Sequence, residues 1–151
     1  MAEHIVLDKV ESTLKDLIET LRDGHEGFIE LGQRIQDPVA RRFFLEETQI
    51  RAEYAAELEN ELHRMGVKDV KVGTSTSSKA HRFWGELKAK LGGGDHALLD
   101  TAEQGEDGAK KAYADALKLE LPAPIKEMLV RQQEHILAVH DRVKAMRDSK
   151  K

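Results

Sequence analysis

Residues 7–38 read LDKVESTLKDLIETLRDGHEGFIELGQRIQDP, and this stretch decides the fold class. Its large apolar residues recur at alternating intervals of three and four, which places them on one stripe of a helix of about 30 residues. The stripe contains Leu7, Val10, Leu14, Leu17, Leu21, Phe28, Leu31 and Ile35. Gly24 stands in the same stripe, where the spacing requires a large side chain.

The end of this stretch predicts a turn and a second helix. Asp37 is a favoured N-cap residue, and Pro38 suits the first position of a helix. A connection this short makes the helices predicted over about 5–36 and 38–65 antiparallel neighbours. Gly66 supplies a C-terminal stop. The inward stripe of the second helix reads Phe44, Glu47, Arg51, Tyr54 or Ala55, Leu58, Leu62 and Met65.

Two further long helices follow a connector. We expect a short helix over about 79–91, a glycine break, and then helices over about 95–119, capped by Asp95, and 123–147. Their inward positions are Leu98 or Leu99, Ala102, Glu106, Ala109, Tyr113 and Ala116, then Leu129, Gln133, Ile136, His140, Val143 and Met146. A long connector is explained by a crossover along the bundle, which leaves the second and third long helices parallel. The sequence therefore predicts a single all-α domain over 1–151, a ferritin-like four-helix bundle with a long crossover that carries a short extra helix.

Composition excludes several function classes. The 151 residues are 40% hydrophobic and 34% charged, with 5% aromatics and three prolines, which suits a charge-rich helical protein. There is no cysteine, so disulfides, thiolate metal sites and cysteine nucleophiles are excluded. A net charge of −4 gives no global electrostatic case for nucleic acid or an anionic membrane as partner. The amino terminus lacks a signal-peptide pattern and no apolar run approaches about 20 residues, so we expect a cytoplasmic protein.

The topology brings polar residues to one level of the bundle. Counting outward from the two short turns gathers Asp23, Glu26, Glu47, Arg51, Glu103, Glu106 and His140 beside the gap at Gly24. Carboxylates and imidazole inside a four-helix bundle are the ligands of di-iron and di-manganese sites. One hypothesis is therefore a mono- or dinuclear iron or manganese site. Its ligands would be Glu103, Glu106, His140 and either Glu47 or Glu57.

Arg51 favours the competing hypothesis. Ferritin-like metal sites use one Glu from each of two helices and Glu-x-x-His from each of the other two. Here the second helix presents Arg51 and Tyr54 at about that place, and Leu137 stands three residues before His140. A guanidinium repels a bound dication but neutralises carboxylates. The layer is then a structural ion-pair network built around Arg51, Asp23 and Tyr54.

Several other residues are interpreted as structural or exposed and not as functional. Trp84, beside Arg82 in the connector, either anchors the crossover on the bundle or forms an anion-binding site, and the anchor is favoured. His25, His63, His96 and His135 lack a paired spacing, so we expect them to be exposed. Serine and threonine cluster without a nearby histidine and acid, so no nucleophilic triad is supported.

Short motifs along nearly the whole chain resemble a known family. They are Asp23-Gly24-His25-Glu26-Gly27-Phe28, Arg51 followed by Glu57-Leu58, His81-Arg82-Phe83-Trp84, Glu103-Gln104-Gly105-Glu106-Asp107 with Tyr113, and Gln133 with His140-Asp141. In this order they resemble a family of small bacterial ferritin-like proteins, a domain of unknown function described as a four-helix-bundle protein. The resemblance implies the ferritin-like fold, a bacterial cytoplasmic setting and a stress-related role. It implies no catalytic residue.

Three functions follow as expectations. The first is a non-enzymatic bundle, a homo-oligomer that acts through its surfaces during stress. The second is an iron- or manganese-dependent oxidase or storage protein. The third is a small-molecule or anion binder at the Gly24 gap or near Arg82 and Trp84.

Overall fold

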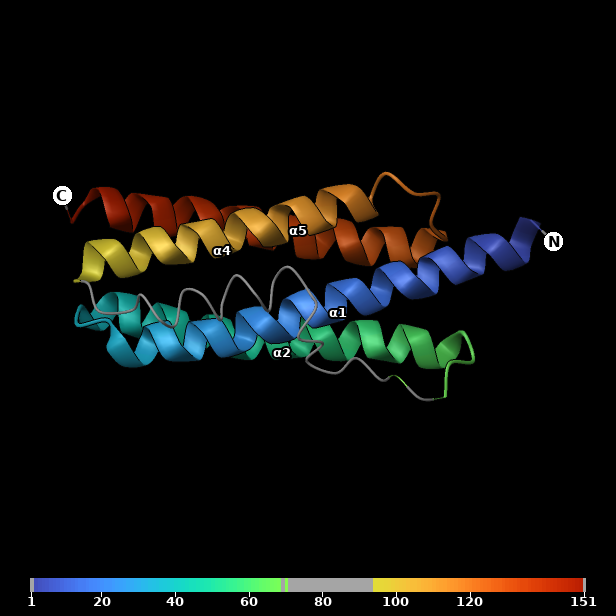
Figure 1. Cartoon of the computed structure of the whole chain (residues 1–151), viewed down its shortest axis with the longest axis horizontal. Helices are drawn as coiled ribbons and strands as arrows, with labels where there is room; N and C mark the ends of the chain where they lie inside the picture. The colour runs from blue at the N-terminus through green and yellow to red at the C-terminus, as the bar shows by residue number, and fades with distance from the viewer. Residues whose placement is uncertain (1, 69, 71–93, 151) are drawn as a thin grey trace.

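The computed structural model describes residues 2–68, 70 and 94–150, with side chains from residue 8 onward. Four helices make up nearly all of this part: α1 (Ala2–Arg34), α2 (Pro38–Arg64), α4 (Asp95–Ala116) and α5 (Ala123–Asp148). They lie lengthwise beside one another (Figure 1), and the described residues contain no strand. The predicted all-α four-helix bundle is confirmed. The short helix predicted over 79–91, Arg82 and Trp84 lie outside the described residues.

Helix directions follow the predicted crossover topology. In Figure 1, α1 runs away from the end marked N, α2 returns, α4 runs in the same direction as α2, and α5 returns again. The end of α2 and the start of α4 are therefore at opposite ends of the bundle. α1 packs against α2 and α4, and α5 packs against α4 and α2. Every neighbouring pair is thus antiparallel, while α2 and α4 are parallel and lie across the diagonal.

The two ends of α4 differ from the prediction. Asp95 is the first helical residue of α4 and Gly94 occupies the N-cap position, so the predicted capping role of Asp95 is wrong. Its carboxylate instead accepts the backbone N–H groups of Gln36 and Asp37, both at 2.9 Å. This contact ties the α1–α2 turn to the start of α4. At its other end α4 stops at Ala116, three residues early, because the last bonds tighten to i→i+3 spacing.

The α1–α2 turn has the predicted geometry without the predicted side-chain bond. Asp37 is the N-cap of α2 with extended backbone, and Pro38 takes the first helical position, but no side-chain capping bond forms. The residue before a proline is pushed out of the helical region, which agrees with the extended backbone of Asp37. α1 ends at Arg34, since the N–H groups of Gln36 and Asp37 donate to Asp95 and not to carbonyl groups of α1. At the end of α2, Gly66 has a φ of +92°, a left-handed conformation that glycine adopts at little cost.

The core consists of two apolar clusters. The first is formed by Val10, Leu14, Leu17, Ile18, Leu21, Ala55, Leu58, Leu62, Ala109, Tyr113, Ala116, Ile125, Leu129 and Ile136. The second is formed by Phe28, Leu31, Ile35, Ala40, Phe44, Leu98, Leu99, Ala102, Val139 and Val143. The predicted stripe of α1 is buried from Val10 to Ile35. Along α1 the boundary between the two clusters falls at Gly24, which is itself buried.

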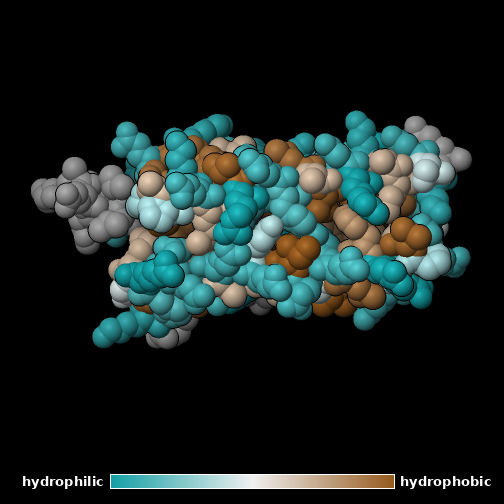
Figure 2. Space-filling model, turned by 180° about the vertical axis from the view of Figure 1, so that it is seen from behind, coloured by the Kyte–Doolittle hydropathy of each residue, from teal (hydrophilic) through white to brown (hydrophobic). Residues whose placement is uncertain are grey.

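The surface is mostly hydrophilic. Seen from behind, hydrophobic surface interrupts it in several places, including the end at which the α1–α2 turn lies (Figure 2). No helix within the described residues combines the length and apolarity that crossing a bilayer requires.

Candidate functional site

A buried arginine lies between the two apolar clusters. Arg51 of α2 is 1% exposed. Its Nε donates to Oε1 of Glu47, one turn earlier on α2, at 2.9 Å. Its Nη2 donates to Oε2 of Glu106 on α4 at 2.6 Å. Both carboxylates are equally buried, so one guanidinium holds two carboxylates together in the centre of the bundle.

Two residues of α1 contact this side chain: Gly24 leaves space for it, and Phe28 packs against it. A Cβ atom at Gly24 would lie 3.7 Å from Nη1 of Arg51, so the guanidinium fills the space that the missing side chain leaves. The Phe28 ring centroid lies 5.0 Å from Cζ of Arg51, within the range of a cation–π contact. The gap expected at Gly24 as a small-molecule site is therefore occupied by the chain itself.

His135 of α5 completes the network at its solvent-facing edge. Its Nε2 lies 2.9 Å from each carboxylate oxygen of Glu47. Tyr54 packs edge-on against the same imidazole, with ring centroids 5.6 Å apart. His135 is half-buried, so its expected exposed position is wrong. The spacing of histidines could not reveal it, because its partner lies 88 positions earlier in the chain.

A second polar pair lies next to the network. The Tyr113 hydroxyl donates to Oε1 of Gln132 at 2.6 Å, and both residues are 0% exposed. Gln133, predicted as the inward residue, is only half-buried; that prediction is wrong. The alternating spacing of four and three that identified α1 also runs through Ile125, Leu129, Gln132, Ile136, Val139 and Val143. Applied to α5, this spacing would have identified Gln132.

Burial and charge shift the titration of the paired groups in different ways. Burial alone lowers the pKa of Arg51, but the carboxylates of Glu106 and Glu47 more than offset it, so the pKa is raised. Burial raises the pKa of Glu106, and Arg51 offsets only part of that rise. Desolvation likewise raises the pKa of Tyr113. Arg51 therefore stays cationic.

Several of the other predicted site residues have partners of their own. Glu57 pairs with Arg131 of α5 at 2.7 Å. Glu103 bonds to Arg147. Asp23 is 5% exposed, whereas Glu26 is exposed. Of the predicted polar layer, Glu47 and Glu106 are both bonded to Arg51, and Tyr54 packs at the margin.

His140 forms a separate acidic group near the surface. Its Nε2 lies 2.9 Å from Oδ1 of Asp107 and 3.6 Å from Oε1 of Glu103. Its Nδ1 lies 3.2 Å from Oδ1 of Asp141. The imidazole is thereby engaged with carboxylates on both of its nitrogen atoms.

These arrangements do not fit an iron or manganese centre. Within the described ranges, no group of three or more His, Asp or Glu side chains is arranged to hold a metal ion. The two central carboxylates point at a guanidinium, whose permanent charge would repel a dication. Both oxygen atoms of Glu47 and Oε2 of Glu106, which a hard metal would need, are already engaged by Arg51 or His135.

Comparison with known proteins assigns the chain to a family. A search among curated proteins found no match. Residues 9–119 match the family described as Domain of unknown function (DUF2383). The match covers well over half of the chain and includes Gly24, Arg51 and Glu106, the residues around which the buried network is built. The chain belongs to the DUF2383 family.

Proposed function

We propose that this domain is a non-catalytic, ferritin-like bundle in which an internal ion-pair network stands in place of a metal centre. The observation that carries the proposal is Arg51, bonded to Glu47 and Glu106 in the middle of the bundle. Di-metal bundles need carboxylates that converge on open coordination positions. Here the same level of the bundle is neutralised by a cation that belongs to the chain.

A bundle with a neutralised centre acts through its surfaces. We place it in the bacterial cytoplasm, as a homo-oligomer with a stress-related role, because its motifs resemble the small ferritin-like proteins of that setting. The buried network then serves specificity, since a polar layer between two apolar clusters fixes one register of the four helices.

Metal analysis tests the proposal directly. The protein is purified without chelators and its iron and manganese content is measured against the double variant E103A/E106A. A matched control, E120A/E127A, removes two carboxylates from exposed positions instead. We expect no stoichiometric metal in any of the three. Near-stoichiometric iron or manganese that is lost in E103A/E106A and kept in E120A/E127A would overturn the proposal.

The alternative is an iron or manganese oxidase or storage protein, for which the acidic group around His140 would have to supply ligands. His140 lies within 3.6 Å of carboxylate oxygens of both Asp107 and Glu103. Anaerobic addition of Fe(II) followed by oxygen separates the two functions. The alternative requires oxidation faster than in buffer, with a loss of rate in H140A; a rate equal to that in buffer supports the structural network.

A further inference from the structure

We infer that the outward face of the first three turns of α2 binds a second copy of this chain across a two-fold axis. The inference deepens the proposed function, because it names the surface through which the bundle acts. Three large hydrophobic residues are exposed in the described part of the chain, and two of them, Val39 (61% exposed) and Leu45 (48% exposed), lie here. Exposed large apolar side chains that gather on one face mark an interaction site.

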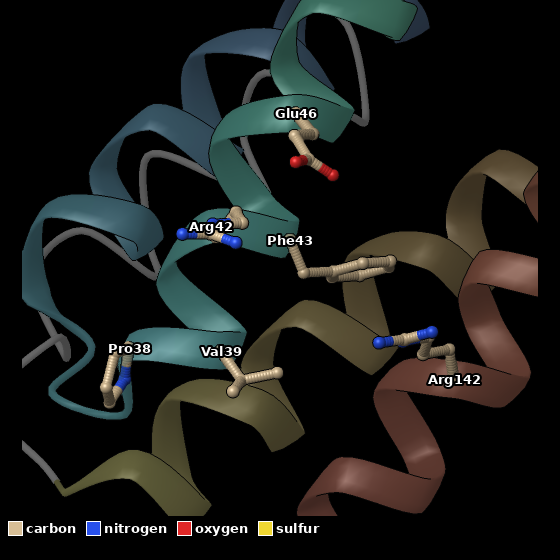
Figure 3. Close-up of a pocket in the computed structure, with 6 residues that line it drawn as sticks. All are labelled: Pro38, Val39, Arg42, Phe43, Glu46 and Arg142. Atoms are coloured by element: carbon tan, nitrogen blue, oxygen red, sulfur yellow. The ribbon is translucent and has the colours of Figure 1, made fainter.

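Two shallow grooves flank the outward ridge of α2. The groove toward α5 is lined by Pro38, Val39, Arg42, Phe43, Glu46 and Arg142. In Figure 3, Phe43 and Arg142 extend toward each other across it, with the guanidinium carbon 5.2 Å from the ring centroid. The groove on the other side is lined by Pro38, Arg41, Arg42, Leu45 and Glu46. Arg42 and Glu46 therefore form a charged ridge between two partly apolar depressions.

The two charges on the ridge have no ion-pair partner among the described residues. Neither Arg42 nor Glu46 makes an ion pair with any residue that the structure describes. They stand four positions apart with the cation first, the less favourable order for a pair along one helix. Elsewhere α1 uses the favourable order, as in Glu11 with Lys15. Both side chains of the ridge thus remain available to a partner.

Helix geometry makes this ridge complementary to itself. At 3.6 residues per turn, Arg42 and Glu46 lie roughly 20° to either side of the direction opposite the buried Phe44. If a second copy packs its α2 antiparallel about a two-fold axis through this point, residues equally far before and after Phe44 face each other. Arg42 then faces Glu46 of the second copy, and the reverse pair forms by symmetry.

The same axis also pairs the flanking apolar side chains. Phe43 and Leu45 lie on opposite flanks of the ridge, and the axis maps each flank onto itself. Leu45 of one copy therefore lies beside Leu45 of the other on one flank, and Phe43 beside Phe43 on the other flank. The two-fold arrangement therefore places opposite charges together and apolar groups together with no further adjustment. An unrelated acidic or basic partner would satisfy only one of the two charges. A second copy satisfies both.

Charge reversal tests the interface. Sedimentation equilibrium should give wild-type protein twice the 17.0 kDa mass of one chain. R42E places two carboxylates opposite each other and E46R places two guanidinium groups opposite each other, each twice by symmetry. Each single variant should raise the dimer Kd about tenfold or more. The double variant R42E/E46R should restore dimerisation, because the opposite charges face each other again.

Mixing the two single variants gives the sharpest result. R42E and E46R chains should form a heterodimer with each other while each alone is monomeric, which a loss of folding could not produce. K111E and E127R, which reverse exposed charges on α4 and α5, serve as controls and should leave the dimer unchanged. A monomeric wild type, or an oligomer unaffected by R42E and E46R, would overturn the inference. Neither result alters the metal content, so the proposed ion-pair centre is judged separately. A monomeric wild type would also remove the homo-oligomer from the proposed function, whereas an oligomer unaffected by R42E and E46R would place the interface on another face.

Discussion

Arg51 reaches across the diagonal of the bundle and donates to Glu106 at 2.6 Å, although the two residues stand on helices that are not neighbours. Only a long side chain can make this contact, and only a small residue on α1 leaves room for it. Gly24 is that residue. One guanidinium thus joins α2 to α4, and it is also bonded to Glu47 on its own helix. Loss of the Arg51 guanidinium should therefore lower the free energy of unfolding.

Removing the cation alone should destabilise the fold strongly. R51M leaves the carboxylates of Glu47 and Glu106 buried without a counter-charge, which costs about 3–5 kcal/mol of unfolding free energy. The triple variant E47L/R51M/E106L removes the charges as well and should lie near the wild type or above it. Urea unfolding followed by circular dichroism measures both. An R51M protein as stable as the wild type would show that the ion pairs contribute nothing.

The free energy of unfolding should depend on pH through the titration of Glu106. Its pKa is raised above the ordinary value of 4.5, so above pH 4.5 the folded chain keeps a proton that the unfolded chain has lost. The stability that this group contributes is full below pH 4.5 and is lost as pH rises through the folded pKa. E106Q cannot titrate there. The difference in unfolding free energy, wild type minus E106Q, should fall with pH by at most about 1.4 kcal/mol per unit.

Urea midpoints measured at a series of pH values give this difference. E127Q, at an exposed position on α5, is the control and should give a difference that does not vary with pH. A difference for E106Q that rises with pH would mean that Arg51 outweighs burial and lowers the pKa of Glu106.

The fold could be predicted because its signals are local and repeated. The spacing of α1 buries every described member of its stripe, and Asp37-Pro38 places the turn to within a residue of where α2 begins. A short turn fixes the level of residues on two antiparallel helices to about one turn. This precision is enough to place Glu47, Arg51 and Glu106 at one level of the bundle from the sequence.

The partners at the margin of the site could not be predicted in the same way. An error of one position rotates a side chain by about 100° around its helix, which separates Gln132 from Gln133 and Ala55 from Tyr54. Glu57 was a candidate ligand but pairs with Arg131 on the neighbouring helix. His135 lies beside the inward stripe, where the pattern does not distinguish a side chain that turns inward from one that faces water. Whether such a side chain turns inward depends on its contacts with the neighbouring helices, which the spacing within one helix does not contain.

Gly24 should tolerate a methyl group and reject a larger one. A Cβ atom there meets Nη1 of Arg51 at 3.7 Å, an ordinary contact. G24A should therefore gain about 0.5–1 kcal/mol from the better helix propensity of alanine. G108A, where a Cβ meets nothing within 4 Å, should gain a similar amount. G24L should instead lose stability, since it displaces the guanidinium from its carboxylates. Thermal unfolding ranks the three, and a stabilised G24L would contradict the described position of Arg51.

Asp95 should hold the α1–α2 turn against the start of α4. Its carboxylate accepts the N–H groups of Gln36 and Asp37, each at 2.9 Å, so D95A leaves two backbone donors without their partner. A loss of about 1–3 kcal/mol is expected, because these are hydrogen bonds to a charged group. Hydrogen exchange locates the effect. The amides of Gln36 and Asp37 should exchange faster in D95A, while that of Ile35, which donates to Leu31 within α1, keeps most of its protection. Unchanged exchange at both turn amides would show that Asp95 does not hold the α1–α2 turn against the start of α4 in solution.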